Sequence, residues 1–258
     1  MKAAWVDGNF DGSISPHDEG FLLGNGVFET MGVFDGALSL WSAHLRRLER
    51  GADALGIPFQ PRRDLPDIAL ELLAREPGDD VLRLTLSAGV LGDPTWCMTT
   101  RRRAASDGPV RLHAASPMAP RRNAAIKTTS RAFYAILLRE ARASGADDAL
   151  LLGADGGVLE TTTANVFFWV GDELRTPRLD GCLLPGVARE AMIGSLAAVS
   201  ARVEESDWTI TDIENGDGFF VTNAVYGPRP ATLPNVDAVP LRPVVREAWR
   251  IATSRPHD

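Results

Sequence analysis

One lysine stands out in this chain as a candidate for covalent chemistry. Of the 27 basic residues, 25 are arginines, and Lys127 is the only lysine besides Lys2. A guanidinium stays protonated and is a poor nucleophile, whereas a neutral lysine amine can condense with a carbonyl group to form an imine. Lys127 is therefore either an ordinary surface lysine or a Schiff-base lysine.

Three further features could together bind a phosphate group. Residues 185–186 (Pro-Gly) precede a predicted helix, so the first N–H groups of that helix, in residues 186–188, lack partners and point outward. Residues 222–224 (Thr-Asn-Ala) follow a short apolar strand, and Arg47 supplies a cation from another predicted helix. Each feature alone is also typical of an ordinary helix start, a turn or a surface ion pair. A phosphate that used all three would define a much more specific site.

A carboxylate could complete this set. Glu160 follows the apolar pair Val158-Leu159 and precedes the segment TTTAN of residues 161–165. A buried acid at such a place can pair with a heterocyclic nitrogen and keep that nitrogen protonated, although a surface acid at a strand end is the alternative. An imine-forming amine, a phosphate site and a carboxylate for a ring nitrogen are together what pyridoxal phosphate requires.

The predicted elements place these residues in or beside regular structure. Apolar spacing predicts a helix that is capped by Ser42 and runs to about Leu55, and this helix would carry Arg47. Alternation of apolar and polar residues predicts a strand over residues 81–87 with Arg83 on its polar face. Further helices are predicted over residues 66–76, 130–144, 187–199 and 243–252, and strands over 149–152, 165–170 and 219–221.

The segment AASPMAPRRN, residues 114–123, predicts a linker. Its two prolines, small residues and paired arginines favour an extended connection. We therefore expect a small N-terminal α/β domain of residues 1–113, an interdomain linker of residues 114–123, and a larger cofactor-binding C-terminal domain of residues 124–258. Lys127 would lie just after the linker.

Composition excludes several classes of protein. The 258 residues include 27 Lys+Arg and 34 Asp+Glu, which gives a net charge of −7, and 45% are hydrophobic. These values are ordinary for a globular protein and unlike a disordered chain or a coiled coil. The acidic balance argues against nucleic acid as a partner.

Cys97 and Cys182 are too few for a disulfide framework and are expected to be buried thiols. The scattered histidines predict no metal site. Because no apolar stretch approaches the roughly 20 residues of a membrane helix, we expect a cytoplasmic protein that binds no membrane.

Several sequence motifs, in order along nearly the whole chain, carry a resemblance to a known family. They are GFLLGNGVFETM (20–31), HLRRL (44–48), IKTTSR (126–131), GADDALLLGADGGVLETTTANVF (145–167), TPRLDGCLLPGVARE (176–190) and VTNA (221–224). The chain resembles the class IV aminotransferases, which are the fold-type IV pyridoxal-phosphate enzymes. This family includes D-amino-acid, branched-chain and (R)-amine transaminases and aminodeoxychorismate lyase.

The resemblance implies a mixed α/β fold of the α+β type with two domains, each a sheet or barrel with packed helices, the active site between them, and a homodimer as the assembly. It implies that the cofactor is pyridoxal 5′-phosphate, that Lys127 is the catalytic Schiff-base lysine, and that Glu160 pairs with the pyridine nitrogen. Arg47 and the residues of the phosphate cup would bind the phosphate. The residues implied to bind the cofactor are Arg47, Lys127, Glu160, Asn165, Gly186, Val187, Ala188, Thr222 and Asn223.

The subgroup depends on three further positions. Branched-chain aminotransferases usually have a tyrosine a few residues after the lysine, where this chain has Arg131 and is more similar to the lyase. Thr30, which ends the FET motif, is also similar to the lyase. The lyase usually has a lysine where this chain has Arg83. Arg83 is similar to an arginine of some transaminases and could bind a substrate carboxylate bidentately. The alternative is that Arg83 forms a structural ion pair. The residues implied to bind substrate are Thr30, Arg83, Arg131 and Ala224.

Arg83 favours a transaminase over the lyase, and the lack of the branched-chain tyrosine favours the D-amino-acid or (R)-amine type. We expect a pyridoxal-phosphate enzyme that transfers an amino group between an amino acid, of the D-amino-acid or (R)-amine type, and a 2-keto acid through a Schiff base on Lys127. The enzyme alternatives are aminodeoxychorismate lyase, which eliminates pyruvate and gives 4-aminobenzoate, and a branched-chain amino acid aminotransferase. A catalytically silent phosphate-binding protein on the same scaffold is the alternative from a different class. The expected partners are small amino and keto acids.

Overall fold

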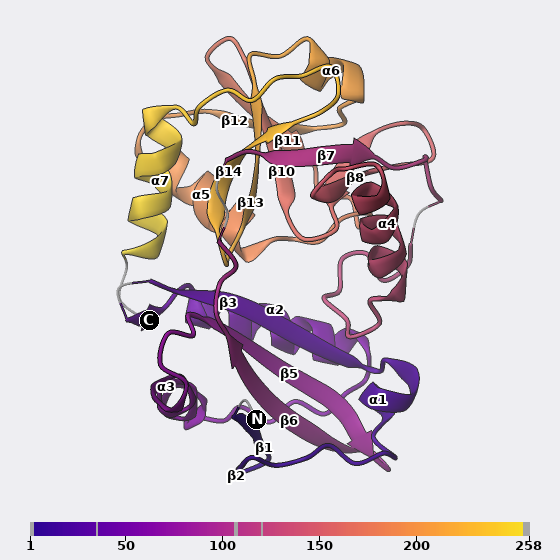
Figure 1. The fold of residues 1–258 in the computed structure, drawn as a ribbon, viewed down its shortest axis with the longest axis vertical. Helices are drawn as coiled ribbons and strands as arrows, with labels where there is room; N and C mark the ends of the chain where they lie inside the picture. Colours follow the sequence, from indigo (N-terminus) through magenta and orange to yellow (C-terminus); the bar gives the residue numbers. More distant parts are fainter. Residues whose placement is uncertain (1–2, 35, 106–107, 120, 255–258) are drawn as a thin grey trace. The chain divides into compact units, whose positions relative to one another are not determined.

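The computed structural model describes residues 3–34, 36–105, 108–119 and 121–254 (Figure 1). The chain forms two compact units. The first comprises the described residues of Met1–Ala105 together with Ile126–Arg131, and the second comprises those of Ser106–Ala125 and Ala132–Pro256. Each unit is a β-sheet with helices packed on it, so the predicted mixed α+β fold is confirmed.

The two units divide the chain differently from the predicted boundaries at residues 113 and 123. Strand β7 (Val110–Ala114) pairs with β14 (Gly227–Thr232) and β8 (Asp148–Leu152), so it belongs to the second unit. Residues Ile126–Arg131 return to the first unit, where Thr128 bridges to Val27. Strand pairing thus decides the division, whereas the proline-rich composition indicated only that the connection is irregular. Pro120 of the predicted linker lies outside the described residues.

The first unit is built on a six-stranded sheet. Its strands are β1 (Ala4–Val6), β2 (Asn9–Phe10), β3 (Gly26–Phe34), β4 (Ala37–Leu38), β5 (Val81–Val90) and β6 (Asp93–Arg101), in the order β2-β1-β6-β5-β3-β4. Its helices are α1 (Glu19–Leu23), α2 (Trp41–Ala54) and α3 (Leu65–Arg75). Strand β5 alternates as predicted: Leu82, Leu84 and Leu86 enter the core, together with apolar residues of α2 and α3. The intervening residues, which include Arg83, lie on the other face.

The second unit is built on an eight-stranded sheet that closes on itself. Its remaining strands are β9 (Val158–Thr161), β10 (Asn165–Val170), β11 (Glu173–Pro177), β12 (Val203–Ser206) and β13 (Phe219–Asn223), and the order is β12-β11-β10-β13-β14-β7-β8-β9. A further pairing of β9 with β10 closes a ring of strands, and this pairing joins Glu160 to Asn165. Two predicted site residues therefore lie at the seam where the barrel closes.

Four helices of the described residues pack on this barrel. They are α4 (Ala132–Ala143), α5 (Val187–Ala198), α6 (Ile210–Glu214) and α7 (Pro243–Thr253) (Figure 1). Along β10, Val166 and Phe168 pack in one cluster with other barrel strands, while Phe167 and Trp169 pack with residues of α5 and α7. This period-2 alternation places Asn165 on the same face as Phe167, toward α5. Among the described helices, none has the length and apolar character needed to cross a membrane.

Two local predictions are wrong. Helix α2 begins at Trp41, and its N-cap is Leu40, which has a left-handed φ of 56° and no side-chain capping bond, so Ser42 lies within the first turn instead of capping the helix. Cys97 and Cys182 are free thiols of intermediate exposure, not buried ones. The first error concerns how the chain enters the helix, and the second concerns how the chain packs around each thiol.

Candidate functional site

Lys127 lies on the short segment Ile126–Arg131 that packs along β3. Thr128 bridges to Val27, and Phe28 N donates to Lys127 O at 2.9 Å. Lys127 Nζ lies 4.8 Å from the centre of the Phe28 ring, and the residue is half-buried. The β3 backbone thus fixes the peptide of Lys127 and leaves its amine beside an aromatic ring.

Arg47 is held by a buried carboxylate of the first unit. Glu29, which is 0% exposed, accepts from Arg47 Nε at 2.7 Å and from Arg47 Nη2 at 2.5 Å, a bidentate pair. His44, one helical turn before Arg47, places Nδ1 2.6 Å from Glu29 Oε2. Residues three apart share a helix face, so α2 presents both side chains to the same strand. The bidentate bond fixes the plane of the Arg47 guanidinium.

The charges of this cluster follow from its burial and contacts. Burial alone would raise the pKa of Glu29, but the charges and hydrogen bonds of Arg47 and His44 lower it to about 2. Burial lowers the pKa of His44, against the opposing effect of Glu29. Glu29 therefore stays ionised at neutral pH, and burial disfavours the protonated form of His44.

Replacing Glu29 should destabilise the protein most at neutral pH. Because the pKa of Glu29 is lowered on folding, the stability it contributes is present above the unfolded-state pKa and is lost as pH falls from about 4.5 to about 2. Glu29→Gln leaves Arg47 buried without its carboxylate, so we expect the free energy of unfolding at neutral pH to fall by about 3 kcal/mol. Urea unfolding of both proteins at neutral and acid pH measures this. A difference that stays constant as the pH falls would contradict the account of Glu29.

Arg83 lies on the opposite face of the same sheet. It pairs in register with Thr30, the residue after Glu29, and successive residues of a strand face opposite ways. Its guanidinium stacks 3.7 Å from the centre of the Phe28 ring, and its Nε donates to Thr85 Oγ1 at 3.3 Å. Burial, and then the charge of Arg131, lower the pKa of Arg83 to about 10. Among the described residues, no carboxylate forms an ion pair with Arg83. The alternative interpretation of Arg83, a structural ion pair, is therefore not seen among those residues.

A cavity of about 430 Å³ opens at this face of the first unit. It is lined by Ile14, Ser15, Pro16, Asp18, Gly20, Phe21, Arg83, Thr85, Ser87, Cys97, Thr99 and Thr129. Arg83 is the only cation in this lining, and most of the remaining residues are apolar or carry a hydroxyl group. Such a cavity can take a small organic anion, with the guanidinium at the anionic group.

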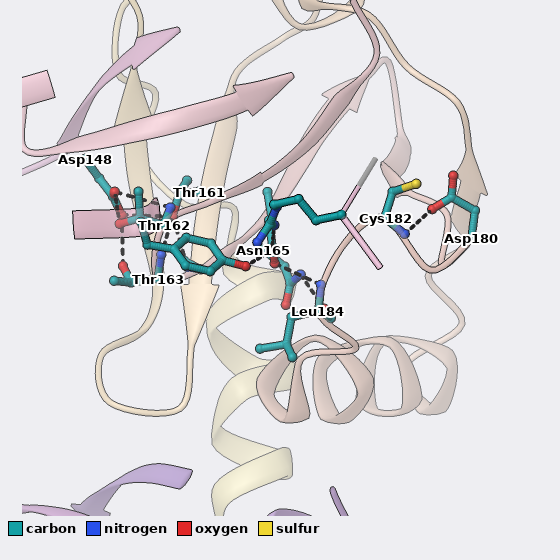
Figure 2. A network of polar contacts seen from close by, with 12 residues as sticks. Asp148, Thr161, Thr162, Thr163, Asn165, Asp180, Cys182 and Leu184 are labelled. Carbon is teal, nitrogen blue, oxygen red and sulfur yellow. Dashed lines mark hydrogen bonds and ion pairs between the residues drawn. The ribbon is translucent and has the colours of Figure 1, made fainter. Parts of the chain in front are cut away.

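Glu160 and Asn165 lie together in the second unit and bind the same peptide. Glu160 is 4% exposed, and its Oε2 accepts from Leu184 N at 3.1 Å. Asn165 Nδ2 donates to Leu184 O at 3.0 Å, as Figure 2 shows. Tyr134 donates its hydroxyl to Glu160 Oε1 at 3.4 Å, and Arg121 Nη2 lies 3.9 Å from the same oxygen. The carboxylate is therefore buried, oriented and close to a cation.

The start of α5 packs against Asn165. A Cβ on Gly186, the N-cap of α5, would lie 1.9 Å from Asn165 Oδ1, so any larger residue there would displace the Asn165 amide. No side chain caps this helix, and its first N–H groups, those of Val187 and Ala188, lack partners within the helix. Thr222 pairs in register with Asn165, and its buried Oγ1 has no hydrogen-bond partner among the described residues. Several unused donors thus meet around Asn165.

Asn223 and Ala224 form the turn that follows Thr222. Asn223 Oδ1 accepts from Val225 N at 3.0 Å and from Tyr226 N at 2.9 Å. The amide oxygen therefore orders the turn, and Ala224 lies buried within it.

The predicted site residues fall into two groups, one in each unit. The first unit contains Lys127, Arg47, Thr30, Arg83 and Arg131, with Arg47 and Arg83 on opposite faces of its sheet, and the second contains Glu160, Asn165, Gly186, Val187, Ala188, Thr222, Asn223 and Ala224.

Comparison with known proteins decides the family. The family model described as "Amino-transferase class IV" matches residues 26–233, most of the chain. This chain belongs to the class IV aminotransferases. It is 28% identical to a Methanocaldococcus jannaschii protein assigned as a branched-chain-amino-acid aminotransferase, over 84% of this chain and 83% of that protein. It is 27% identical to an aminodeoxychorismate lyase of Bacillus subtilis, over 86% and 83%.

Solved structures of class IV aminotransferases agree with this fold. A Legionella pneumophila protein assigned as a 4-amino-4-deoxychorismate lyase is 28% identical, with a TM-score of 0.86 over 93% of this chain and 94% of that chain. The pyridoxal-phosphate-bound form of a hypothetical aminotransferase from Mycobacterium tuberculosis, 24% identical, has the same fold, with a TM-score of 0.88 over 98% and 99%. The family shares its fold between transaminases and lyases, so fold alone does not choose the reaction.

The class IV aminotransferases depend on pyridoxal phosphate, and the residues of this chain fit that cofactor. Thr222 Oγ1 is a buried hydroxyl without a described partner, and the N-terminus of α5 offers free N–H groups for an anion. Glu160 is a buried carboxylate of the kind that pairs with a protonated ring nitrogen. When bound, the cofactor supplies an electron sink for bond cleavage in the substrate. The roles of the individual residues remain predictions.

Sequence reasoning missed several residues of these two groups. Glu29 and His44 were inside quoted motifs but had no assigned role, although the i,i+3 spacing of His44 and Arg47 could have indicated a shared partner. Tyr134 and Arg121 contact Glu160 from distant positions in the sequence, and no local pattern marks them. The contacts of Leu184 use only its backbone, so its identity carries no signal.

Proposed function

We propose that this class IV enzyme is a transaminase that moves an amino group between an amino acid, preferably a D-amino acid or an (R)-amine, and a 2-keto acid. Lys127 would hold the cofactor as a Schiff base and move the proton between the substrate Cα and the cofactor C4′. Arg47, the N-terminus of α5 and Thr222 would bind the phosphate, and Glu160 would pair with the ring nitrogen. The preference for D-amino acids rests on Arg131, which replaces the tyrosine of the branched-chain type.

The observation that best supports this proposal is the charge at Arg83. A half-buried guanidinium has no ion-pair partner among the described carboxylates, is repelled by Arg131, and borders a mostly apolar cavity. A carboxylate would neutralise this charge. Amino acids and 2-keto acids both carry one and (R)-amines do not, so this charge supports the D-amino-acid type. The cavity would then take the carboxylate at Arg83 and an apolar substrate side chain beside it.

Aminodeoxychorismate lyase is the second candidate function. Two observations favour it: Arg131 and Thr30 are more similar to the lyase, and one relative of 27% identity is an aminodeoxychorismate lyase. This reaction would use the same Lys127 and would need no keto acid. The branched-chain type is supported by the Methanocaldococcus relative. We further propose that the enzyme is a homodimer, as the resemblance implies, and that it is cytoplasmic.

The visible spectrum of the holoenzyme distinguishes these functions. D-alanine, D-glutamate or an (R)-amine, added without a keto acid, should convert the cofactor to its amine form, and later addition of pyruvate or 2-oxoglutarate should restore the original band. L-leucine conversion in place of this would favour the branched-chain type. Release of 4-aminobenzoate from aminodeoxychorismate without a keto acid, with no response to any amine donor, would favour the lyase and reject our proposal.

Replacing Arg83 should weaken substrate binding. Losing a charge-assisted bidentate bond costs about 1.5–3 kcal/mol, so Arg83→Gln should raise KM for amino and keto acids by roughly 10- to 100-fold. Steady-state kinetics measure this. Arg75→Gln is the matched control, because Arg75 lies in the same unit and forms an exposed pair with Glu71. An unchanged KM in Arg83→Gln would remove Arg83 from the substrate site.

A further inference from the structure

Asp148 is a buried carboxylate that the proposed chemistry does not use. It begins β8, is 6% exposed, and accepts hydrogen bonds from three consecutive threonine hydroxyls, as Figure 2 shows. Thr161 Oγ1 and Thr163 Oγ1 donate to Oδ2, each at 2.9 Å, and Thr162 Oγ1 donates to Oδ1. The N–H groups of Ala149 and Thr162 also donate to Oδ1, at 2.8 and 3.3 Å. Five donors around one carboxylate offset much of the cost of burying its charge.

The three threonines form the turn between β9 and β10. Leu150 of β8 pairs with Thr161, so Asp148, two residues earlier on the antiparallel partner, lies beside the turn. Thr161 Oγ1, which donates to Asp148, itself accepts from Thr163 N at 3.2 Å and Ala164 N at 2.9 Å. Asp148 therefore orients the hydroxyl that closes the turn.

This turn sets the positions of Glu160 and Asn165. The two residues form the one register pair between β9 and β10 among the described residues. Beside this pair, Thr161 N donates to Ala164 O at 2.7 Å and closes the turn, and the side-chain bonds to Asp148 add to this single backbone bond. Both residues then bind the backbone of Leu184, which lies two residues before Gly186. The placement of Glu160 and the approach to α5 thus depend on the geometry of one turn.

We propose that Asp148 is a positioning residue, which holds the turn of residues 161–164 so that Glu160 and Asn165 keep the geometry needed for the cofactor. This inference rests on the proposed role of Glu160. Among the described residues, Asp148 forms no hydrogen bond with Glu160 or Asn165, and it acts through the threonine hydroxyls. A displaced turn would move the Glu160 carboxylate relative to the ring nitrogen and would weaken the pairing that keeps that nitrogen protonated.

Two variants and one matched control test this role. Asp148→Asn keeps the shape of the side chain but leaves one acceptor oxygen where there were two. Thr161→Val removes the hydroxyl that links Asp148 to the turn. Thr176→Val is the control: Thr176 is also buried in a strand of the second unit (0% exposed, against 1% for Thr161). It loses one hydroxyl bond, to Val166 O, whereas Thr161→Val loses the bond to Asp148 and those from the N–H groups of Thr163 and Ala164. For each holoenzyme we would measure the pH titration of the cofactor's visible band, the steady-state constants and the thermal unfolding midpoint.

We expect Asp148→Asn and Thr161→Val to shift the pH titration of the band and to lower kcat by about tenfold with little change in KM, since a small misplacement of a reacting group costs up to roughly 100-fold. Thr176→Val should lower only the unfolding midpoint. A fall in unfolding midpoint for both test variants, with titration and kcat as in wild type, would make Asp148 merely structural and overturn the inference. Glu160→Gln, measured in parallel, distinguishes failure of the proposed role of Glu160 from failure of the positioning role of Asp148. If Glu160→Gln also leaves the titration and kcat unchanged, the proposed role of Glu160 is wrong and the inference about Asp148 is overturned with it.

Discussion

Lys127→Arg should abolish turnover while leaving a folded protein. Arginine keeps the positive charge beside Phe28 and His44 but cannot form an imine with the cofactor at neutral pH. The variant also loses the amine that would move the substrate proton, a contribution of about 10²–10⁴-fold by itself. We expect kcat to fall by at least about 10⁴-fold. The half-reaction with D-alanine, followed by absorbance, measures this.

The conservative change makes the result specific to the amine. The chain already uses arginine for 25 of its 27 basic residues, so Lys127→Arg adds no unusual residue type. Circular dichroism and the unfolding midpoint should match those of the wild type. If the variant kept turnover within a few fold of wild type, Lys127 would not be the Schiff-base residue.

Glu160→Gln should cause the second largest loss of activity. A glutamine keeps the hydrogen bond from Leu184 N but cannot balance a protonated ring nitrogen, so the ring becomes a weaker electron sink. Removing one preorganised electrostatic partner of this kind costs about 10²–10³-fold in kcat. Single-turnover kinetics with a saturating amino donor isolate this step from binding.

Glu160→Asp is the control for this prediction. Aspartate keeps the charge but shortens the side chain, so it should lose less rate than glutamine does and should leave the cofactor's pH titration closer to that of wild type. Equal losses in the two variants would indicate that position, and not charge, is what Glu160 provides. A rate near wild type in Glu160→Gln would reject its assigned role.

Sequence motifs predicted local elements around the candidate site but not its long-range contacts. Glu160, Asn165 and residues 186–188 lie within motifs whose turns and helix starts are local, and the structure brings these residues together around Leu184. Glu29 and Arg47 meet only because α2 packs on β3, and that packing is not encoded in a short segment. The contact of Asp148 with residues 161–163 likewise depends on the register between β8 and β9.

The domain boundary shows the same limit. The composition of residues 114–123 predicted an irregular connection, but β7 ends within this region because it pairs with β8 and β14, far along the chain. The segment Ile126–Arg131 joins β3 through Thr128 and Thr129, so the lysine that sequence placed in the C-terminal domain belongs to the first unit. Sequence propensity reflects only the residues that are near in the chain. The assignment of β7 and of Ile126–Arg131 to their units depends on pairing with strands that are distant in the sequence.

Borohydride reduction of the holoenzyme, followed by tryptic digestion and mass spectrometry, tests the central claim most directly. Reduction converts an imine into a stable secondary amine, and trypsin does not cleave after a lysine modified in this way. The account predicts a single peptide of residues 123–131, NAAIKTTSR, that carries the reduced cofactor on Lys127. Cofactor found on Lys2 or on the terminal amine, with unmodified peptides 123–127 and 128–131, would contradict it.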